Sequence, residues 1–441
     1  MTFSKNKRGF SLIEALIGTV VFSLIALSSY KAFGVLMDAV LESQAKIAAT
    51  EVANERFEIL RNLPYVDVGI VGGLPVGKIA RNQTVVRDNY SFSVLTTIRS
   101  VDDTFDGTIG GSPNDTSPAD YKLADLDITC SNCKIFNPLK FTTLISPRAL
   151  ETGLTNGALF MQVIDSSGLP VSGASMHIAN TQTNPDTIID EVTDTSGFVR
   201  IVDAVPGANA YNITATKTGY SQDQTYIPGG AAGATPLKPD STVVAQQITQ
   251  VSFAIDKLSS LDVSTVNASC VAIPNIGFSL TGTKLIGTGV LKYPAHTFTT
   301  NGTGILNIPN LEWDTYSTLL TSASYDLAGM TPLPSFALSP NTTQTLKIIA
   351  VPHVNMALLV TVKDSANNPI DGATVRLQKS GFDQTKTTNS GTCPTPGEVF
   401  WNGLASGTYT LTVSKAGYTT SINNALSIST AWKNQTVILG P

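Results

Sequence analysis

The stretch of sequence that decides the fold reads Lys7-Arg8-Gly9-Phe10-Ser11-Leu12-Ile13-Glu14, and an apolar run follows it to about Leu27. From Phe10 to Met37 the side chains are almost all apolar or small, and about 20 such residues in a helix cross the hydrocarbon core of a bilayer. Basic residues precede the run and none follows it until Lys31, so the positive-inside rule predicts a cytoplasmic amino end and an exported remainder.

Glu14 sets this segment apart from a secretory signal peptide and from a plain membrane anchor. A carboxylate inside a lipid-facing helix costs about 2.5 to 3.5 kcal/mol on insertion scales, so it needs a partner. A signal peptide also ends in a small-residue cleavage site, for which Ala26-Leu27-Ser28 would serve only weakly. Neither alternative explains the acid.

The residues from Lys7 to about Leu27 resemble the class III leader of type IV pilins and pseudopilins. In that family a prepilin peptidase cuts after the glycine, here Gly9, and methylates the new terminal residue, here Phe10. The acid four residues on, here Glu14, then pairs with the terminal amine of a neighbouring subunit during filament assembly on the inner-membrane platform. Phe10 and Glu14 also lie at positions i and i+4 on one helix face, and the amino end of a helix favours negative charge.

Composition favours an exported protein rich in β-structure. The chain has 441 residues, enough for three or four domains, and only 14% of them are charged. The formal charge of -5 gives no electrostatic case for nucleic-acid binding, so we expect no nucleic-acid partner.

The helical pattern continues beyond the membrane run until Pro64, the first definite stop. It predicts a helix over 10–62, about 80 Å long at 1.5 Å per residue. A hairpin over 78–87 and 90–101, turning at Asp88-Asn89, and a strand over 121–128 are expected to form a small antiparallel head against this helix.

The acids that follow the hairpin have two interpretations. Calcium takes six to eight oxygen ligands, and the acids offer such oxygens, although the spacing of an EF-hand is absent. Asp and Asn also populate turns for backbone reasons alone, so solvated turns are the alternative. Calcium is the one cofactor that the sequence suggests. Its candidate ligands are Asp102, Asp103, Asp106 and Asp120, with Asp115 beside them.

Four cysteines lie in the part of the chain expected outside the cell, where disulfides persist. Cys130 and Cys133 fall between expected strands over 126–129 and 134–136, without the strand-then-helix context of a redox motif or the second ligand pair of a zinc site. We expect a local disulfide between them and a longer bridge between Cys270 and Cys393.

After about Leu154 the chain repeats itself. The first unit begins with a strand over 159–164 and an Asp-Ser-Ser-Gly turn, and the second begins with a strand over 358–362 and a related turn. Both units end in the sequence Lys-x-Gly-Tyr, at 217–220 and at 415–418. Short strands separated by Gly, Pro and Asx turns are typical of β-sandwiches. The two units resemble carboxypeptidase-regulatory-like modules of the transthyretin and Cna B kind, and a middle unit is expected to be a divergent copy.

The predicted fold class is mainly β with one long N-terminal helix, a pilin-like antiparallel head and about three tandem Ig- or transthyretin-like sandwiches. The expected divisions are a leader (1–9), a transmembrane and filament-core helix (10–62), a head (63–153), a first module with its linker (154–256), a divergent second module (257–352) and a third module (353–441).

We expect no enzyme, because His177, His296 and His353 lack a neighbouring glutamate at zinc spacing and no nucleophile or phosphate-loop motif occurs. The leading hypothesis is a minor or tip subunit, with adhesive duty, of a type IV pilus-like filament. The alternatives are a pseudopilin of a type II secretion-like machine and, less favoured, a membrane-anchored hydrolase with binding modules.

The partners that this hypothesis implies are other pilin subunits, prepilin peptidase, the inner-membrane assembly platform, the membrane and a surface ligand. The expected location is the membrane before assembly and a cell-surface filament afterwards. The sandwich loops are rich in Ser, Thr and Gly without an aromatic cluster in sequence, so they do not identify the ligand.

Overall fold

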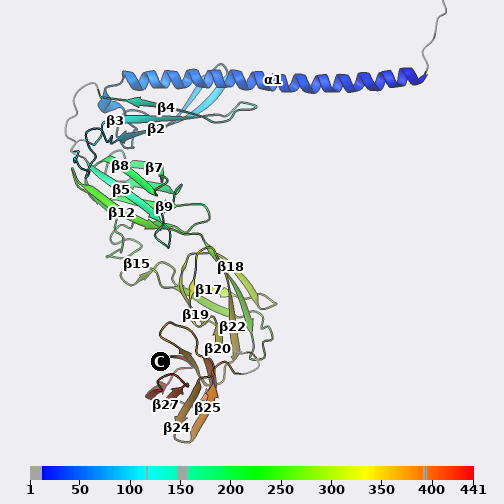
Figure 1. Ribbon diagram of the computed structural model, residues 1–441, viewed down its shortest axis with the longest axis vertical. Coiled ribbons are helices and arrows are strands. Elements are labelled where there is room, and N and C mark those ends of the chain that lie inside the picture. The colour runs from blue at the N-terminus through cyan, green and yellow to red at the C-terminus, as the bar shows by residue number, and fades with distance from the viewer. Residues whose placement is uncertain (1–11, 116–117, 148–155, 391–392, 394) are drawn as a thin grey trace, which may run out of the picture.

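The computed structural model describes residues 12–115, 118–147, 156–390, 393 and 395–441. One long N-terminal helix, α1 (Leu12–Asn62), is followed by a succession of small β-sheets. Figure 1 shows α1 running across one end of a column of β units. The expected fold class, one long helix followed by several small Ig-like β-sheets, is confirmed.

α1 has 51 residues and is therefore about 77 Å long at 1.5 Å per residue. It ends where Leu63 donates its N–H to the carbonyl of Ile59, because Pro64 has no N–H with which to continue. The predicted helix is confirmed from Leu12 onward, and its first two expected residues, Phe10 and Ser11, lie outside the described residues.

The head is a four-stranded antiparallel sheet in sequence order. Its strands are β1 (Asn82–Arg87), β2 (Tyr90–Val101), β3 (Tyr121–Cys130) and β4 (Leu139–Ile145). Asp88 and Asn89 form the predicted hairpin turn with φ of 50° and 67°, the left-handed pair that a type I′ turn requires. The head core joins this sheet to α1, with Phe92, Val94 and Ile98 packed against buried helix residues.

The expected strand over 134–136 is wrong. The segment passes over the edge of the head core, where the ring of Phe136 packs 5.8 Å from that of Phe92, and pairing resumes only at β4. Pro138, which has no N–H to donate, immediately precedes the new strand.

Three sandwiches follow the head. The first module contains β5 (Gly157–Ile164), β6 (Ser175–Asn180), β7 (Thr187–Val192), β8 (Phe198–Ala204), β9 (Gly207–Thr216), β10 (Asp223–Gln224), β11 (Ser241–Val243) and β12 (Ile248–Ala254). The second contains β13 (Ser259–Val266), β14 (Gly277–Gly282), β15 (Leu285–Gly287), β16 (Val290–Leu291), β17 (His296–Thr299), β18 (Ile305–Leu311), β19 (Asp314–Leu320), β20 (Tyr325–Thr331), β21 (Ser335–Leu338) and β22 (Thr343–Pro352). The third contains β23 (Met356–Lys363), β24 (Thr374–Lys379), β25 (Phe382–Thr387), β26 (Glu398–Leu404), β27 (Gly407–Ser414), β28 (Ser421–Ile428) and β29 (Trp432–Ile438).

The three modules share one strand connectivity. In the first, β5 pairs in parallel with β12 and antiparallel with β8, while β6 pairs with β7 and β9. In the second, β13 pairs likewise with β22 and β18, and β14 with β17 and β19. In the third, β23 pairs with β29 and β26, and β24 with β25 and β27. The second module therefore has the topology of a divergent copy, interrupted by the short β15–β16 hairpin.

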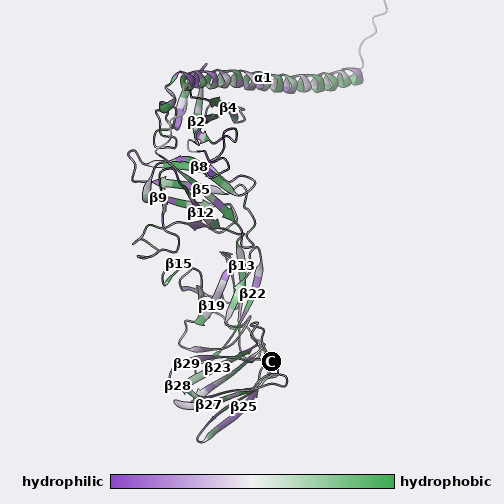
Figure 2. Cartoon of the chain, turned by 60° about the vertical axis from the view of Figure 1, so that its left-hand side comes forward, coloured by the Kyte–Doolittle hydropathy of each residue, from purple (hydrophilic) through white to green (hydrophobic). Residues whose placement is uncertain are grey.

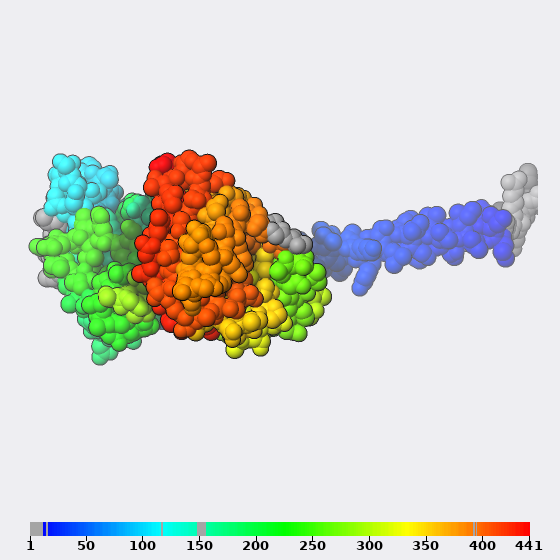
Figure 3. Space-filling view, turned by 90° about the horizontal axis from the view of Figure 1, so that it is seen from below, coloured from blue at the N-terminus to red at the C-terminus, as the bar shows by residue number. Residues whose placement is uncertain are grey.

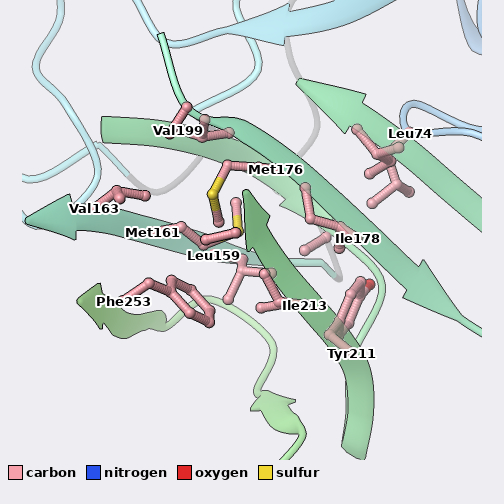
Figure 4. Close-up of a cluster of buried hydrophobic side chains, with 14 of the residues drawn as sticks. Leu74, Leu159, Met161, Val163, Met176, Ile178, Val199, Tyr211, Ile213 and Phe253 are labelled. Carbon is pink, nitrogen blue, oxygen red and sulfur yellow. The ribbon is translucent and has the colours of Figure 1, made fainter. Parts of the chain in front are cut away.

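Each module also contains the same kind of hydrogen bond, from a buried tyrosine hydroxyl to a backbone carbonyl a few residues earlier in the chain. The three bonds are Tyr211 to Val205 at 2.8 Å, Tyr316 to Glu312 at 2.8 Å and Tyr409 to Ala405 at 2.7 Å. A buried phenol needs such an acceptor, which explains why the same residue type recurs here. Figure 4 shows Tyr211 at the edge of the first-module core, together with Leu74 from the head.

The units are joined by specific contacts. Leu74 is buried in the core of the first module, and Arg81 of the head pairs with Asp190 of β7 at 2.8 Å. Between the second and third modules, the indole N–H of Trp432 donates to the carbonyl of Leu327 at 2.8 Å. The head and modules therefore interlock through buried side chains as well as through the chain itself.

Candidate assembly helix and acidic loop

The amino-terminal half of α1 leaves its apolar side chains uncovered. Leu12 is 86% exposed and Phe22 is 72% exposed, and the helix is long and apolar enough to cross a membrane. Figure 2 shows this half as largely hydrophobic, and Figure 3 shows it projecting away from the β units. Apolar surface of this extent needs a lipid or a protein partner, which favours a membrane and other helices as its surroundings.

Glu14 lies in the first turn of α1 and is exposed. It is the only charged residue between Leu12 and Tyr30. The predicted cleavage residues Gly9 and Phe10 lie outside the described residues.

The other half of α1 holds the head. Ala49, Val52 and Ala53 are fully buried in the head core, where their small side chains let the sheet approach the helix closely. Lys134 pairs with Asp38 at 2.6 Å and Arg87 with Glu51 at 3.5 Å around this core. Exposed pairs of this kind add little stability each, so the apolar contact is the main link between helix and head.

The structure joins the four cysteines in two disulfides. Cys130 and Cys133 are bonded at the end of β3, with Cα atoms 5.6 Å apart. Cys270 and Cys393 are bonded with Cα atoms 5.0 Å apart and link the second module to the third. The pairings are those expected from the sequence.

The acidic loop between β2 and β3 brings together three carboxylates, from Asp102, Asp115 and Asp120. Their nearest oxygen atoms all lie within 4.8 Å of one another. Asp115 is only 9% exposed, and the Oδ1 atom of Asp102 is buried and accepts no hydrogen bond from the described residues. Two expected ligands, Asp103 and Asp106, are not part of this group, and Asp103 instead accepts the N–H of Phe105 within its own turn.

Burial raises the pKa of Asp102 and of Asp120 above the ordinary value for aspartate. Repulsion between the carboxylates raises both pKa values further. Hydrogen bonds lower them: the backbone N–H of Ile109 donates to Asp102, and that of Asp103 donates to Asp120. A divalent cation would relieve that repulsion and would give the buried Oδ1 atom of Asp102 a partner, so the donor set fits an oxygen-binding ion such as calcium.

The three histidines do not converge. His177 contacts Asp190 at 2.6 Å, His296 contacts the carbonyl of Pro294 at 2.7 Å, and His353 contacts Asp326 at 2.9 Å. Among the described residues, the aspartate trio is the only grouping of three or more potential metal-ligating His, Cys, Asp or Glu side chains.

Sequence reasoning missed an aromatic gathering at the junction of the first and second modules. Tyr220, Tyr226, Tyr293 and Tyr316 line one cleft there, although they are far apart in the chain. The tyrosines come from three separate segments, so no local sequence signal reveals the cluster.

Two family models match the chain. One, described as the prokaryotic N-terminal methylation motif, matches residues 4–30, and the other, the carboxypeptidase regulatory-like domain, matches residues 357–437. The first match includes the start of α1 and residues that precede it, and the second covers nearly all of the third module. No curated protein matches the chain.

Several solved structures are similar over part of the chain. The Bacillus anthracis TIE protein shares 11% identity, over 81% of this chain and 73% of its own, with a TM-score of 0.20. A streptococcal ancillary pilin shares 13% identity, over 64% and 98%, with a TM-score of 0.19. GBS52, the minor pilin of Streptococcus agalactiae, shares 14% identity, over 41% and 95%, with a TM-score of 0.17.

The methylation motif, the exposed hydrophobic helix that follows it and the tandem β-sandwiches together define a pilin-like structural protein. The motif also implies processing by prepilin peptidase, and the helix is consistent with residence in the membrane and then in a surface pilus.

Proposed function

We propose that the protein is a minor or tip subunit, with adhesive duty, of a type IV pilus-like filament. The observation that carries the proposal is the continuity of the methylation motif with a helix whose apolar half is uncovered and whose other half holds the head. Cleavage between Gly9 and Phe10 retains that helix, and N-methylated Phe10 becomes the mature terminus. The uncovered half then packs against the same half of neighbouring subunits.

A low copy number follows from the size of the exported part. Three modules continue beyond the head in a column, and each would need room at every subunit position of a dense filament (Figure 1). A subunit at the tip, or one inserted rarely, has that room. The modules then point away from the filament, where they can reach a surface ligand.

Glu14 is the proposed assembly residue. Its carboxylate receives the terminal amine of Phe10 from a neighbouring subunit, which satisfies both charges in the apolar filament core. Leaving one member of a desolvated charge pair alone costs about 3 to 5 kcal/mol, enough to exclude a subunit from the filament.

The test compares Glu14→Ala with Glu58→Ala, which removes an exposed carboxylate near the far end of the same helix. We expect Glu14→Ala to leave membrane insertion and processing intact, because removing an acid from a lipid-facing helix eases insertion by about 2.5 to 3.5 kcal/mol. Immunoblots of membrane and sheared-filament fractions should show the Glu14→Ala protein only in membranes. Equal recovery of both variants in filaments would contradict the assigned role.

We also propose that the acidic loop binds calcium through Asp102, Asp115 and Asp120, which replaces the set expected from the sequence. The support is the convergence of three carboxylates, where burial and repulsion raise the pKa values of Asp102 and Asp120 and so disfavour the charged forms of these two. The bound ion would fix the loop that connects β2 to β3.

A further inference from the structure

The first and second modules are joined twice, and a cleft lies between the two connections. One connection is the chain itself, through residues 255–258. The other is an arm, the first-module loop 225–240, which contacts the β15–β16 hairpin of the second module through hydrogen bonds from Leu237 to Ile286 at 2.9 Å and from Thr288 to Thr235 at 3.1 Å. Figure 1 shows β15 at this junction.

The arm is closely fitted. A Cβ atom added at Gly287 would lie 1.8 Å from the carbonyl oxygen of Ala232, so only glycine lets the two backbones meet there. Lys292 crosses the cleft from the second module and donates to the carbonyl of Gln222 in the first at 2.6 Å. The relative position of the two walls is therefore fixed by contacts as well as by the linker.

The main hollow has a volume of about 430 Å³, and an adjoining hollow of about 260 Å³ shares several of its lining residues. The larger volume lies within the roughly 300 to 1,000 Å³ usual for small-ligand sites. Tyr220 and Tyr226 line it from the first module and Tyr293 from the second, and Tyr316 borders it with a side chain that is only 1% exposed. The ring of Tyr293 stands edge-on to that of Tyr316, with centroids 5.5 Å apart, and this contact orients it.

The charged groups in the cleft are balanced by one another. Glu312 pairs with Lys284 at 2.8 Å and with Lys292 at 2.7 Å. Asp314 accepts the backbone N–H groups of Thr283 and Lys284. Two lysines thus face two acids, and the cleft offers no excess charge to a charged ligand.

Besides the tyrosine hydroxyls, the uncharged polar side chains of the cleft are three amides and the hydroxyl of Ser221. The side chains of Gln222, Gln224 and Asn310 line the cleft, and each carboxamide both donates and accepts hydrogen bonds. In the adjoining hollow the indole N–H of Trp313 is buried and has no hydrogen-bond partner among the described residues.

We propose that this cleft binds one or two residues of a neutral glycan. A sugar ring presents a face of C–H groups, which packs on aromatic rings, and a rim of hydroxyls, which exchange hydrogen bonds with carboxamides. Aromatic walls, amide groups and balanced charge are the combination that such a ligand requires. A sialylated or sulfated glycan would bring an anion that finds no uncompensated lysine.

The inference gives the adhesive duty of the proposed function a ligand class, and in that sense it rests on the proposed function. Glycan binding itself does not depend on filament assembly, because β15 and β19, which supply lining residues of the two hollows, lie apart from α1 in the column (Figure 1). Loss of filament recovery in Glu14→Ala and loss of glycan binding are therefore separate results.

The test uses the full-length protein in a detergent without a sugar head group, since a glycoside detergent would compete for the cleft. The protein is applied to an array of neutral, sialylated and sulfated oligosaccharides with proline-rich peptides as a further class. The best glycan is then titrated as a fluorescent conjugate. We expect binding to neutral glycans, weakened at least tenfold by Tyr220→Leu.

Tyr418→Leu is the matched control. Tyr418 occupies the corresponding position in the third module, at the end of the same Lys-x-Gly-Tyr turn, and each tyrosine packs against its own module core. Both substitutions should lower thermal stability similarly, while only Tyr220→Leu should weaken binding. Asn310→Gly is a second variant, because glycine tolerates the φ of 59° at this position, and it should weaken binding several-fold.

Three outcomes would overturn the proposal: no binding to neutral glycans, a preference for anionic glycans or peptides, or equal binding by the Tyr220→Leu, Asn310→Gly and Tyr418→Leu variants.

Discussion

Glu398 is a buried acid at the junction between the second and third modules. It is 2% exposed, and its Oε2 atom accepts the backbone N–H of Met330 at 2.7 Å, while its Oε1 atom is buried and has no hydrogen-bond partner in the described part of the chain. Burial raises the pKa of Glu398 to about 8, and the hydrogen bonds with Met330 and Thr395 lower this pKa by a smaller amount. The residue is therefore protonated in the folded protein at neutral pH.

This protonation predicts a pH dependence of stability. An acid with a raised pKa binds its proton more tightly in the folded state than in the unfolded state, so stability falls as pH rises from about 4.5 through about 8. Glu398→Gln resembles the protonated form and should lose this part of the dependence. Calorimetric melting of both proteins at pH 5, 7 and 9 should give curves that diverge as pH rises, and parallel curves would contradict the assignment.

At Asp120 the expected result is a calcium-dependent gain in stability. Calcium should raise the melting temperature of the parent protein, a chelator should reverse the gain, and Asp120→Asn should abolish most of it, because one of three converging carboxylates is lost. Asp106→Asn removes a nearby acid outside the trio and serves as control. The gain should shrink as pH falls, because the raised pKa values of Asp102 and Asp120 let protons compete with the ion. Identical melting of all three proteins with and without calcium would exclude the site.

Among the elements, α1 has two halves with different environments. Its first half is apolar and uncovered, and its second half supplies small side chains to the head core. Because no proline interrupts it between Leu12 and Asn62, one continuous rod connects the proposed filament core to the exported part.

The two disulfides differ in the length of chain that they close. Cys130 and Cys133 are three positions apart, whereas Cys270 and Cys393 are 123 positions apart. In the chain-entropy account, closing a loop of about 100 residues stabilises by about 4.7 kcal/mol and closing a 15-residue loop by about 3 kcal/mol. Replacing Cys270 and Cys393 by serine should therefore lower calorimetric stability more than replacing Cys130 and Cys133. A larger loss from the local pair would contradict this ranking.

Elements whose determinants are close in the chain can be predicted from the sequence. The β1–β2 hairpin follows from Asp88-Asn89, because both residue types tolerate the left-handed backbone of the turn. The end of α1 follows from Pro64 in the same way. These are local constraints, and the printed sequence contains them in full.

The acidic loop and the glycan cleft depend on contacts that local patterns do not contain. Asp115 joins Asp102 and Asp120 because the loop after β2 folds back, which no periodicity indicates. Tyr220 and Tyr293 meet only because the arm and the linker hold two modules together. The sequence therefore predicts an acidic loop but does not indicate which of its aspartates converge, and it predicts no aromatic cleft.

At the scale of the whole molecule, the protein is one long helix, with an uncovered apolar first half, that carries a column of interlocked β units. Side-chain contacts connect the units at each described junction: Leu74 lies in the first-module core, and Trp432 packs against the second module. These contacts favour a stiff column over domains that move independently on flexible linkers. Such a column would hold the proposed glycan cleft well away from the filament axis.

The most direct test of the central claim is mass spectrometry of the mature amino terminus in protein recovered from sheared surface filaments. The account predicts a chain that begins at Phe10, with one added methyl group on its terminal nitrogen, and that retains the whole of α1. A terminus at Met1, or one beyond Leu27, would contradict processing as a pilin and with it the proposed place of the protein in a filament.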